Sequence, residues 1–236
     1  MDKRKGLKSE YVSVKRKNSD VLTFGGDQGF FHIQEGSKAD KRKNASGCGI
    51  VAFGDLLLYL GKRGKDFEIQ ESKAYINRIM EEEEYKNYYN SVYSLLGGIP
   101  FSGGVSGFKL FLSFNRIARK KGWTLRARWG MSRKKLLPRI EEMLSRDIPV
   151  ILCIPMMVRK KDKKEGLWLY HISDGSRAVF TKAHYVTITG MIQKNDILYY
   201  EVSSWGRKYY INVSEYDALI HTHFMGTILG NILYIK

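Results

Sequence analysis

Apolar and polar positions follow different periods in the two halves of the chain, and the first half has the pattern of helices. Residues 48–60 are apolar almost all the way round, which predicts a buried helix. Apolar positions at helical spacing predict further helices over about 68–80, 83–95 and 108–122. The charged stretch 36–47 lacks this pattern and is predicted to be a loop.

From about residue 123 onward the apolar positions recur at the spacing of strands. WTLRARW at 123–129 alternates, and PVILCIP at 149–155 has the pattern of a buried strand. Two helices are predicted in this half, over 132–147 and 214–221. Five further runs are rich in β-branched and aromatic residues: GLWLYHI, HYVTITGMI, ILYYEVSS, KYYINV and NILYIK. Because helices come first and strands follow, the sequence predicts an α+β fold with a mostly antiparallel sheet.

The same pattern predicts the domain organisation. Residues 1–24 form a basic N-terminal arm, and residues 25–236 form a single domain. Its helical lobe covers about 45–122 and its sheet lobe about 123–236. A chain of 236 residues that is 43% hydrophobic and 13% aromatic is large enough to bury a sizeable core in one domain.

Composition argues against several classes of protein. No stretch reaches the roughly 18 uninterrupted apolar residues of a membrane span. The basic N-terminus lacks the apolar segment of a secretory signal, so we expect a cytoplasmic protein. Two cysteines, Cys48 and Cys153, are too few for a disulfide framework or a cysteine zinc site, and we expect no metal or cofactor.

The formal net charge of +16 is concentrated in parts of the chain. Residues 101–140 hold eleven Lys or Arg and no acid, and RKKDKK follows at 159–164. Such segments either form a solvated surface or bind nucleic acid or another anionic surface. The sequence has no recognition-helix, zinc-knuckle or RNA-binding aromatic motif to support a nucleic-acid partner.

Cys48 is a candidate nucleophile because it opens the predicted buried helix. The positive end of a helix dipole and the unpaired N–H groups there favour a thiolate. Gly47 and Gly49 flank the cysteine, let the backbone turn and leave room for a substrate. The alternative is a cysteine that packs as a small apolar residue. Cys153, inside an apolar strand, fits that alternative better.

A histidine that begins a predicted strand is the candidate base. His184 opens HYVTITG, 136 residues after Cys48, and a ring at a strand start can point into a cleft. Papain-type peptidases place the histidine about 130–150 residues after the cysteine. The alternative is a histidine with a structural role in the core or on the surface.

The strand at 197–204 is predicted to pair with HYVTITGMI and runs into SSWG at 203–206. Here the chain resembles the papain-like cysteine peptidases, in which a cysteine opens a central helix, a histidine starts a strand, and the next strand carries an orienting Asn followed by Ser-Trp-Gly. GCGIVA and its apolar helix resemble the bacterial double-glycine leader peptidase branch. The resemblance covers roughly 25–60 and 148–236. It implies a papain-like fold whose helical lobe, with Cys48 on its central helix, packs against an antiparallel sheet or half-barrel.

The resemblance also implies thiol-dependent hydrolysis of a peptide or protein substrate. The Cys48 thiolate attacks a carbonyl carbon, and His184 takes up and returns the proton. A third group orients the histidine ring. Ser203 aligns with the orienting Asn, and Ser204 and Asp196 are the alternatives.

A glutamine amide is expected to complete the oxyanion hole with the Cys48 N–H. Gln28, in a glycine turn that enters a short strand over 25–34, is preferred, and Gln34 at the strand end is the alternative. Trp205 is either a wall over the histidine or an ordinary sheet aromatic. Two other functions stay open: a papain-like fold that binds a peptide without cutting it, and a basic protein that binds nucleic acid or an anionic surface.

Overall fold

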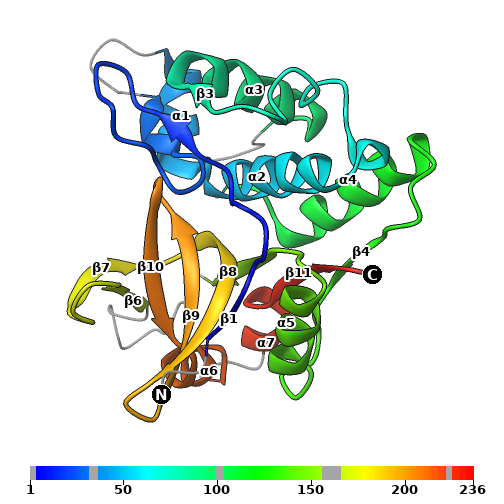
Figure 1. The fold of residues 1–236 in the computed structure, drawn as a ribbon. Coiled ribbons are helices and arrows are strands. Elements are labelled where there is room, and N and C mark those ends of the chain that lie inside the picture. Colours follow the sequence, from blue (N-terminus) through cyan, green and yellow to red (C-terminus); the bar gives the residue numbers. More distant parts are fainter. Residues whose placement is uncertain (1–3, 32–36, 99–103, 156–165, 222–224) are drawn as a thin grey trace. The chain divides into compact units, whose positions relative to one another are not determined.

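A computed structural model of the chain describes residues 4–31, 37–98, 104–155, 166–221 and 225–236. Seven α-helices and a large antiparallel sheet lie within these ranges (Figure 1). The predicted α+β class is therefore confirmed.

The chain divides into two compact units whose segments alternate along the sequence. The helical unit comprises Ser9–Ala127 together with Ser204–Arg207 and Lys236. The sheet unit comprises Met1–Lys8, Arg128–Ser203 and Lys208–Ile235. The turn at 204–207 thus belongs to the helical unit although it joins two strands of the sheet.

Among the described residues, nine strands form the main sheet, in the order β4-β11-β5-β8-β9-β10-β6-β7 with β1 also paired to β8. The strands run antiparallel in the pairs that contain β8, which contacts β1, β5 and β9. Their bounds are β1 Arg4–Gly6, β4 Ala127–Trp129, β5 Val150–Ile154, β6 Leu167–His171, β7 Arg177–Thr181, β8 His184–Lys194, β9 Ile197–Ser204, β10 Arg207–Asn212 and β11 Ile232–Ile235.

A long hairpin of β8 and β9 positions the histidine-bearing strand (Figure 1). Its turn, Asn195 and Asp196, has positive φ angles of 45° and 62°, as in a type I′ turn. His184 is the first residue of β8 and pairs with Ile154 of β5. Strand β5 is buried at every residue, and β8 is buried at all residues except Tyr185, Gln193 and Lys194, in keeping with their mostly β-branched and apolar sequences.

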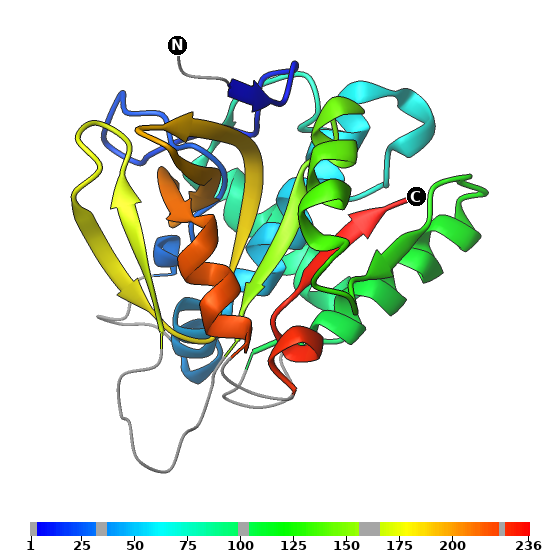
Figure 2. The same ribbon diagram turned by 90° about the horizontal axis from the view of Figure 1, so that it is seen from below.

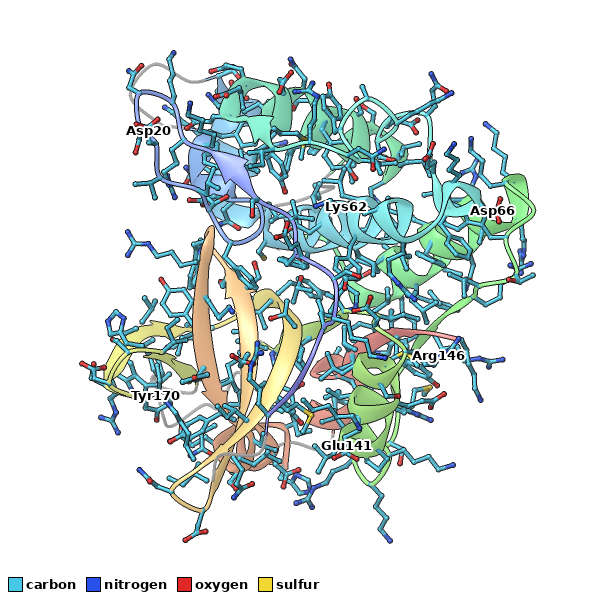
Figure 3. The ribbon with its side chains drawn as sticks, in the orientation of Figure 1. Asp20, Lys62, Asp66, Glu141, Arg146 and Tyr170 are labelled. Atoms are coloured by element: carbon cyan, nitrogen blue, oxygen red, sulfur yellow. The ribbon has the colours of Figure 1, made fainter. Side chains whose placement is uncertain are left out.

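Three helices in the described part of the chain belong to the sheet unit. Helix α5 (Leu136–Ser145) packs on β1, β5 and β11 through its apolar stripe (Figure 2). Pro138 lies in its first turn, where a missing N–H is tolerated. Helix α6 (Val213–His221) packs on β6 and on α7 (Gly226–Leu229). Tyr170 of β6, labelled in Figure 3, donates its hydroxyl to Glu215 of α6 at 2.6 Å.

Helix α2 forms the core of the helical unit, and α3 and α4 pack against it. Its residues from Leu56 to Gly61 are all buried, which explains a sequence that is apolar on every side. Lys62, labelled in Figure 3, lies in its last turn, where a cation is favoured by the helix dipole. The elements of this unit are β2 Val14–Lys15, η1 Gln28–Phe30, α1 Lys38–Ser46, α2 Cys48–Arg63, η2 Lys65–Phe67, β3 Met80–Glu81, α3 Glu82–Leu95 and α4 Gly107–Lys120.

The structure corrects two of the predicted elements. Residues 36–47, predicted to be a loop, contain helix α1, which begins at the cap Ser37 and has no buried residue to give an apolar pattern. Residues 68–80, predicted to be a helix, are mostly turns. Ile69, Ser72 and Ile76 are buried at helix-like spacing, but the Ser72 hydroxyl donates to the Ile69 carbonyl at 3.1 Å and closes a turn instead.

The N-terminal and strand predictions also differ from the structure in detail. Residues 1–24, predicted to be an arm, contribute β1 to the main sheet and β2 to a parallel pair with β3. Residues 28–30, where a turn was expected to enter a strand, form the short helix η1. Strand β7 was not predicted. In the described part of the chain no single helix is long and apolar enough to cross a membrane; α1 and α2 together meet that length and composition, but they are bent by 73°.

Candidate functional site

Cys48 is the first residue of α2 and is half-buried. Gly47 is the N-cap, and a glycine has no side chain that could cap this helix end. The helix therefore presents the positive end of its dipole beside the thiol, which favours the thiolate. Cys153 is buried inside β5, in keeping with the packing role predicted for it.

Gln28 is fixed close to the cysteine along α1. Its Nε2 donates to the carbonyl oxygen of Asn44 at 2.6 Å, and the Nδ2 of Asn44 donates to the Phe31 carbonyl oxygen at 2.9 Å. These two amides join η1 to α1 four residues before Cys48. Gln34, the alternative, lies outside the described residues.

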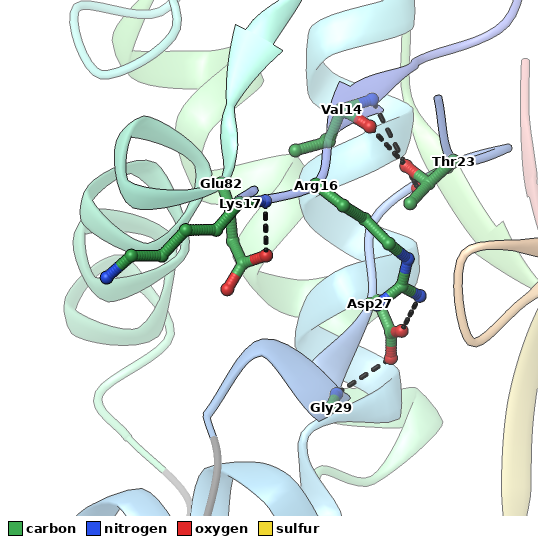
Figure 4. Close-up of polar contacts among 8 residues, drawn as sticks. Val14, Arg16, Lys17, Thr23, Asp27, Gly29 and Glu82 are labelled. Atoms are coloured by element: carbon green, nitrogen blue, oxygen red, sulfur yellow. Dashed lines mark hydrogen bonds and ion pairs between the residues drawn. The ribbon is translucent and has the colours of Figure 1, made fainter. Parts of the chain in front are cut away.

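Ion pairs and hydrogen bonds hold the segment that carries Gln28 (Figure 4). Asp27 caps η1 by accepting from the Gly29 N–H at 2.7 Å, and Arg16 donates to its other oxygen at 2.7 Å. Thr23 exchanges hydrogen bonds with the Val14 backbone, donating at 3.2 Å and accepting at 3.1 Å. The loop before Gln28 is thus attached to β2.

The SSWG motif forms a turn that binds the same segment. Trp205 and Gly206 have positive φ angles of 48° and 67°, as in a type I′ hairpin turn. The Gly206 N–H donates to the Gly26 carbonyl at 3.1 Å, and the Phe24 N–H donates to the Gly206 carbonyl at 2.9 Å. The motif therefore supports the Gln28 loop through its backbone, and half-buried Trp205 is a turn residue rather than a strand residue.

A buried carboxyl group on α2 also contacts this loop, and the sequence analysis did not identify it as a candidate. Asp55, two turns after Cys48, accepts from the Gly26 N–H at 2.9 Å, from Tyr85 at 2.9 Å and from Tyr11 at 3.4 Å. Burial raises the pKa of Asp55 to about 7, although the three hydrogen bonds act in the opposite direction. Its signal in the sequence was one acid within an otherwise apolar helix.

His184 begins β8, as predicted, and is 5% exposed. Burial lowers the pKa of its imidazole to about 3, so the ring is neutral at pH 7. The other two histidines that the structure describes, His171 and His221, are exposed on the surface. His184 is thus the buried imidazole among the described histidines, and its burial disfavours the protonated form.

The strand register separates the three candidate orienters of His184. Ser203 pairs with Thr187, which is three residues from His184, so Ser203 and His184 point to opposite faces of the sheet. Ser204, the next residue, ends β9 and belongs to the helical unit. Asp196 lies in the turn beyond the far end of β8. His184 and Lys194, the two ends of this strand, are ten residue steps of about 3.3 Å apart, so Asp196 is too far from His184 to orient its ring.

The candidate residues fall into two groups. Cys48, Gln28 and Trp205 belong to the helical unit, whereas His184 and Ser203 belong to the sheet unit. In the helical unit, Gly206 of the SSWG turn is hydrogen-bonded to Phe24 and Gly26 in the loop before Gln28. No group of three His, Cys, Asp or Glu side chains suited to a metal ion occurs among the described residues.

Comparison with models of known protein families, with curated proteins and with solved structures gives no match.

Proposed function

We propose that the chain is a papain-like thiol hydrolase of peptide or amide bonds, similar to the double-glycine leader peptidases. One observation carries the proposal: Cys48 opens the buried helix α2 directly after the N-cap Gly47, and the Gln28 amide is bound to Asn44, four residues before Cys48. A nucleophile and an oxyanion donor are the two groups that acyl transfer requires first.

In the proposed reaction the Cys48 sulfur attacks the carbonyl carbon and the C–N bond breaks to leave a thioester. The Cys48 N–H and the second N–H of Gln28 stabilise the oxyanion, since the Asn44 carbonyl uses only one of the two amide hydrogens. His184 accepts the thiol proton and passes it to the leaving amine. Water, deprotonated by the same ring, then hydrolyses the thioester and restores the thiol.

The orienting role passes from Ser203 to Ser204 in this proposal. Ser204 follows Ser203 in β9, where successive side chains alternate between faces, and its hydroxyl can accept from an imidazole N–H. The proposed fold is that of the papain-like enzymes, with the nucleophile on a central helix and the base on an antiparallel sheet.

Alkylation of Cys48 by iodoacetamide across pH tests the nucleophile. We expect an apparent thiol pKa well below the ordinary value of about 8.5. Peptide mapping separates Cys48 from Cys153, and hydrolysis of a peptide library by the wild type against Cys48→Ala tests the reaction. A Cys48 thiol that titrates near 8.5, together with equal hydrolysis by both proteins, contradicts the proposal.

The register of Ser203 favours a second candidate function. Because the residue at the Asn position faces away from His184, a fold that binds a peptide without cleaving it is the alternative. A library peptide that binds wild type and Cys48→Ala with equal affinity, and stays intact with both, supports binding over hydrolysis.

A further inference from the structure

Tyr89 of α3 carries a buried hydroxyl that has no hydrogen-bond partner among the described residues. The side chain is 1% exposed, and burial of an unpaired hydroxyl is unfavourable because its hydration is lost without replacement. Native structures keep few such groups, so this one calls for an explanation beyond packing.

The hydroxyl of Tyr89 is directed at the N-terminus of α2. A Cβ atom built on Gly47 would lie 2.4 Å from it, so the absence of a side chain at Gly47 gives the hydroxyl its space. The next residue is Cys48, and the hydroxyl is close enough for negative charge on Cys48 to act with burial in raising the pKa of Tyr89. Tyr89 therefore stays protonated and remains a donor.

Aromatic packing fixes the Tyr89 ring in this position. Its centroid is 4.7 Å from that of Phe31 and 6.5 Å from that of Tyr93. Lys43 is the charged residue next to this cluster. Its Nζ lies 5.1 Å from the Phe31 ring centroid and donates to Asp40 Oδ1 at 3.0 Å. The ring cannot turn away easily, so the donor is preorganised toward the helix end.

We propose that the Tyr89 hydroxyl donates a hydrogen bond to the Cys48 thiolate and holds the nucleophile in its ionised form. The inference rests on the proposed function only in taking Cys48 as the reacting group. A phenolic O–H is a strong donor to an anion, and the buried site has the low polarity in which such a bond counts most. The hydrogen bond from Tyr89 and the dipole of α2 would both stabilise negative charge on the Cys48 sulfur.

The test compares Tyr89→Phe with Tyr93→Phe, a matched loss of one hydroxyl on the same helix. Iodoacetamide alkylation of Cys48, followed by peptide mapping across pH, measures the thiol pKa without any hydrolysis. We expect Tyr89→Phe to raise this pKa by about one unit and Tyr93→Phe to leave it unchanged. Tyr89→Phe should unfold in urea no earlier than wild type, because it removes an unpaired hydroxyl.

An unchanged Cys48 pKa in Tyr89→Phe overturns the inference, as does an equal rise in Tyr93→Phe. Early unfolding of Tyr89→Phe also counts against it, since the hydroxyl would then have a structural partner. If the thiol pKa rises as expected but wild type cleaves no peptide, the role of Tyr89 stands and the proposed hydrolase function fails.

Discussion

The side-chain nitrogen of Gln28 lies 2.6 Å from the carbonyl oxygen of Asn44, to which it donates. Asn44 precedes Cys48 by four residues, so this bond sets where the Gln28 amide stands relative to the start of α2. The bond uses one of two amide hydrogens, and the second is the donor that the proposed oxyanion hole needs.

Loss of the Gln28 amide is expected to slow acyl transfer but not alkylation. With an activated ester, which forms an oxyanion at the carbonyl, Gln28→Ala should acylate Cys48 on the order of 100-fold more slowly than wild type. Iodoacetamide forms no oxyanion, so its rate with Cys48 should stay the same. Equal slowing in both reactions would instead indicate that Gln28 supports the structure of the helix end.

Gly206 is expected to be more sensitive to substitution than a glycine of the same backbone conformation elsewhere. Gly206 and Gly175 have φ angles of 67° and 73°, so alanine strains both by roughly 1–2 kcal/mol. A Cβ on Gly175 meets nothing within 4 Å, whereas one on Gly206 lies 3.0 Å from Thr23 Cγ2 and 3.3 Å from Asp27 Cβ. Urea unfolding should therefore show Gly206→Ala less stable than Gly175→Ala by about 1–3 kcal/mol.

The same pair of variants tests whether the SSWG turn supports the Gln28 loop. Gly206→Ala should slow ester acylation of Cys48 as well as lower stability, because the Gly206 backbone binds Gly26, two residues before Gln28. Gly175→Ala should leave the acylation rate unchanged. Similar acylation rates in the two variants would show that the SSWG turn does not support the position of Gln28.

The sequence predicted most of the fold where apolar periodicity matched secondary structure. Helix α2 was predicted from its apolar residues, and β8 and β9 from their β-branched and aromatic runs. Periodicity failed for α1, which buries no residue, although Ser37 followed by Asp40 carries the capping signal. Periodicity also predicted a helix that is absent from the described residues 68–80. Ile69, Ser72 and Ile76 are buried at helix-like spacing, but they lie within turns.

The candidate site was predictable in its types of residue but not in its supporting contacts. Cys48 at a helix start and His184 at a strand start follow from local pattern. The bonds from Gln28 to Asn44 and from Gly26 to Asp55 join segments 16 and 29 residues apart, and no local pattern specifies them. The choice between Ser203 and Ser204 depends on strand register, which alternation alone leaves open by one residue.

Asp55 is expected to make the protein less stable as pH rises. Its pKa is about 7 in the folded chain against an ordinary value of 3.8, so between these values the folded state holds a proton that the unfolded state has released. The contribution is present in full below about pH 4 and is lost by about pH 7. The rise of the Asp55 pKa from 3.8 to about 7 corresponds to about 4 kcal/mol in the free energy of unfolding.

Asp55→Asn removes this titration while keeping the side-chain shape. The free energy of unfolding from urea titrations should be higher in Asp55→Asn than in wild type at pH 8, and the difference should shrink toward pH 4. His184, whose lowered pKa reduces stability as pH falls below about 6.5, is present in both proteins and cancels. Exposed Asp66 (Figure 3) gives the control Asp66→Asn, and the same pH dependence there would contradict the assignment to Asp55.

The proposed reaction requires His184 to reach the Cys48 sulfur, and a cysteine in place of the histidine tests this without any substrate. In a Cys153→Ser background, His184→Cys leaves two thiols, one at each proposed catalytic position. A short bifunctional alkylating reagent such as dibromobimane should bridge the two thiols within one molecule. The bridged protein should gain the mass of one reagent linker and still migrate as a monomer on a denaturing gel. We expect most of the protein to be bridged.

Asp196→Cys in the same background is the matched control. Position 196 lies beyond the far end of β8, roughly 30 Å from His184 along the strand, so a reagent that spans a few ångströms should alkylate its two thiols separately. Bridging of His184→Cys but not of Asp196→Cys supports a Cys48–His184 pair. If His184→Cys is also alkylated separately, His184 is not the base for Cys48, because a proton cannot pass directly between groups that a short reagent fails to join.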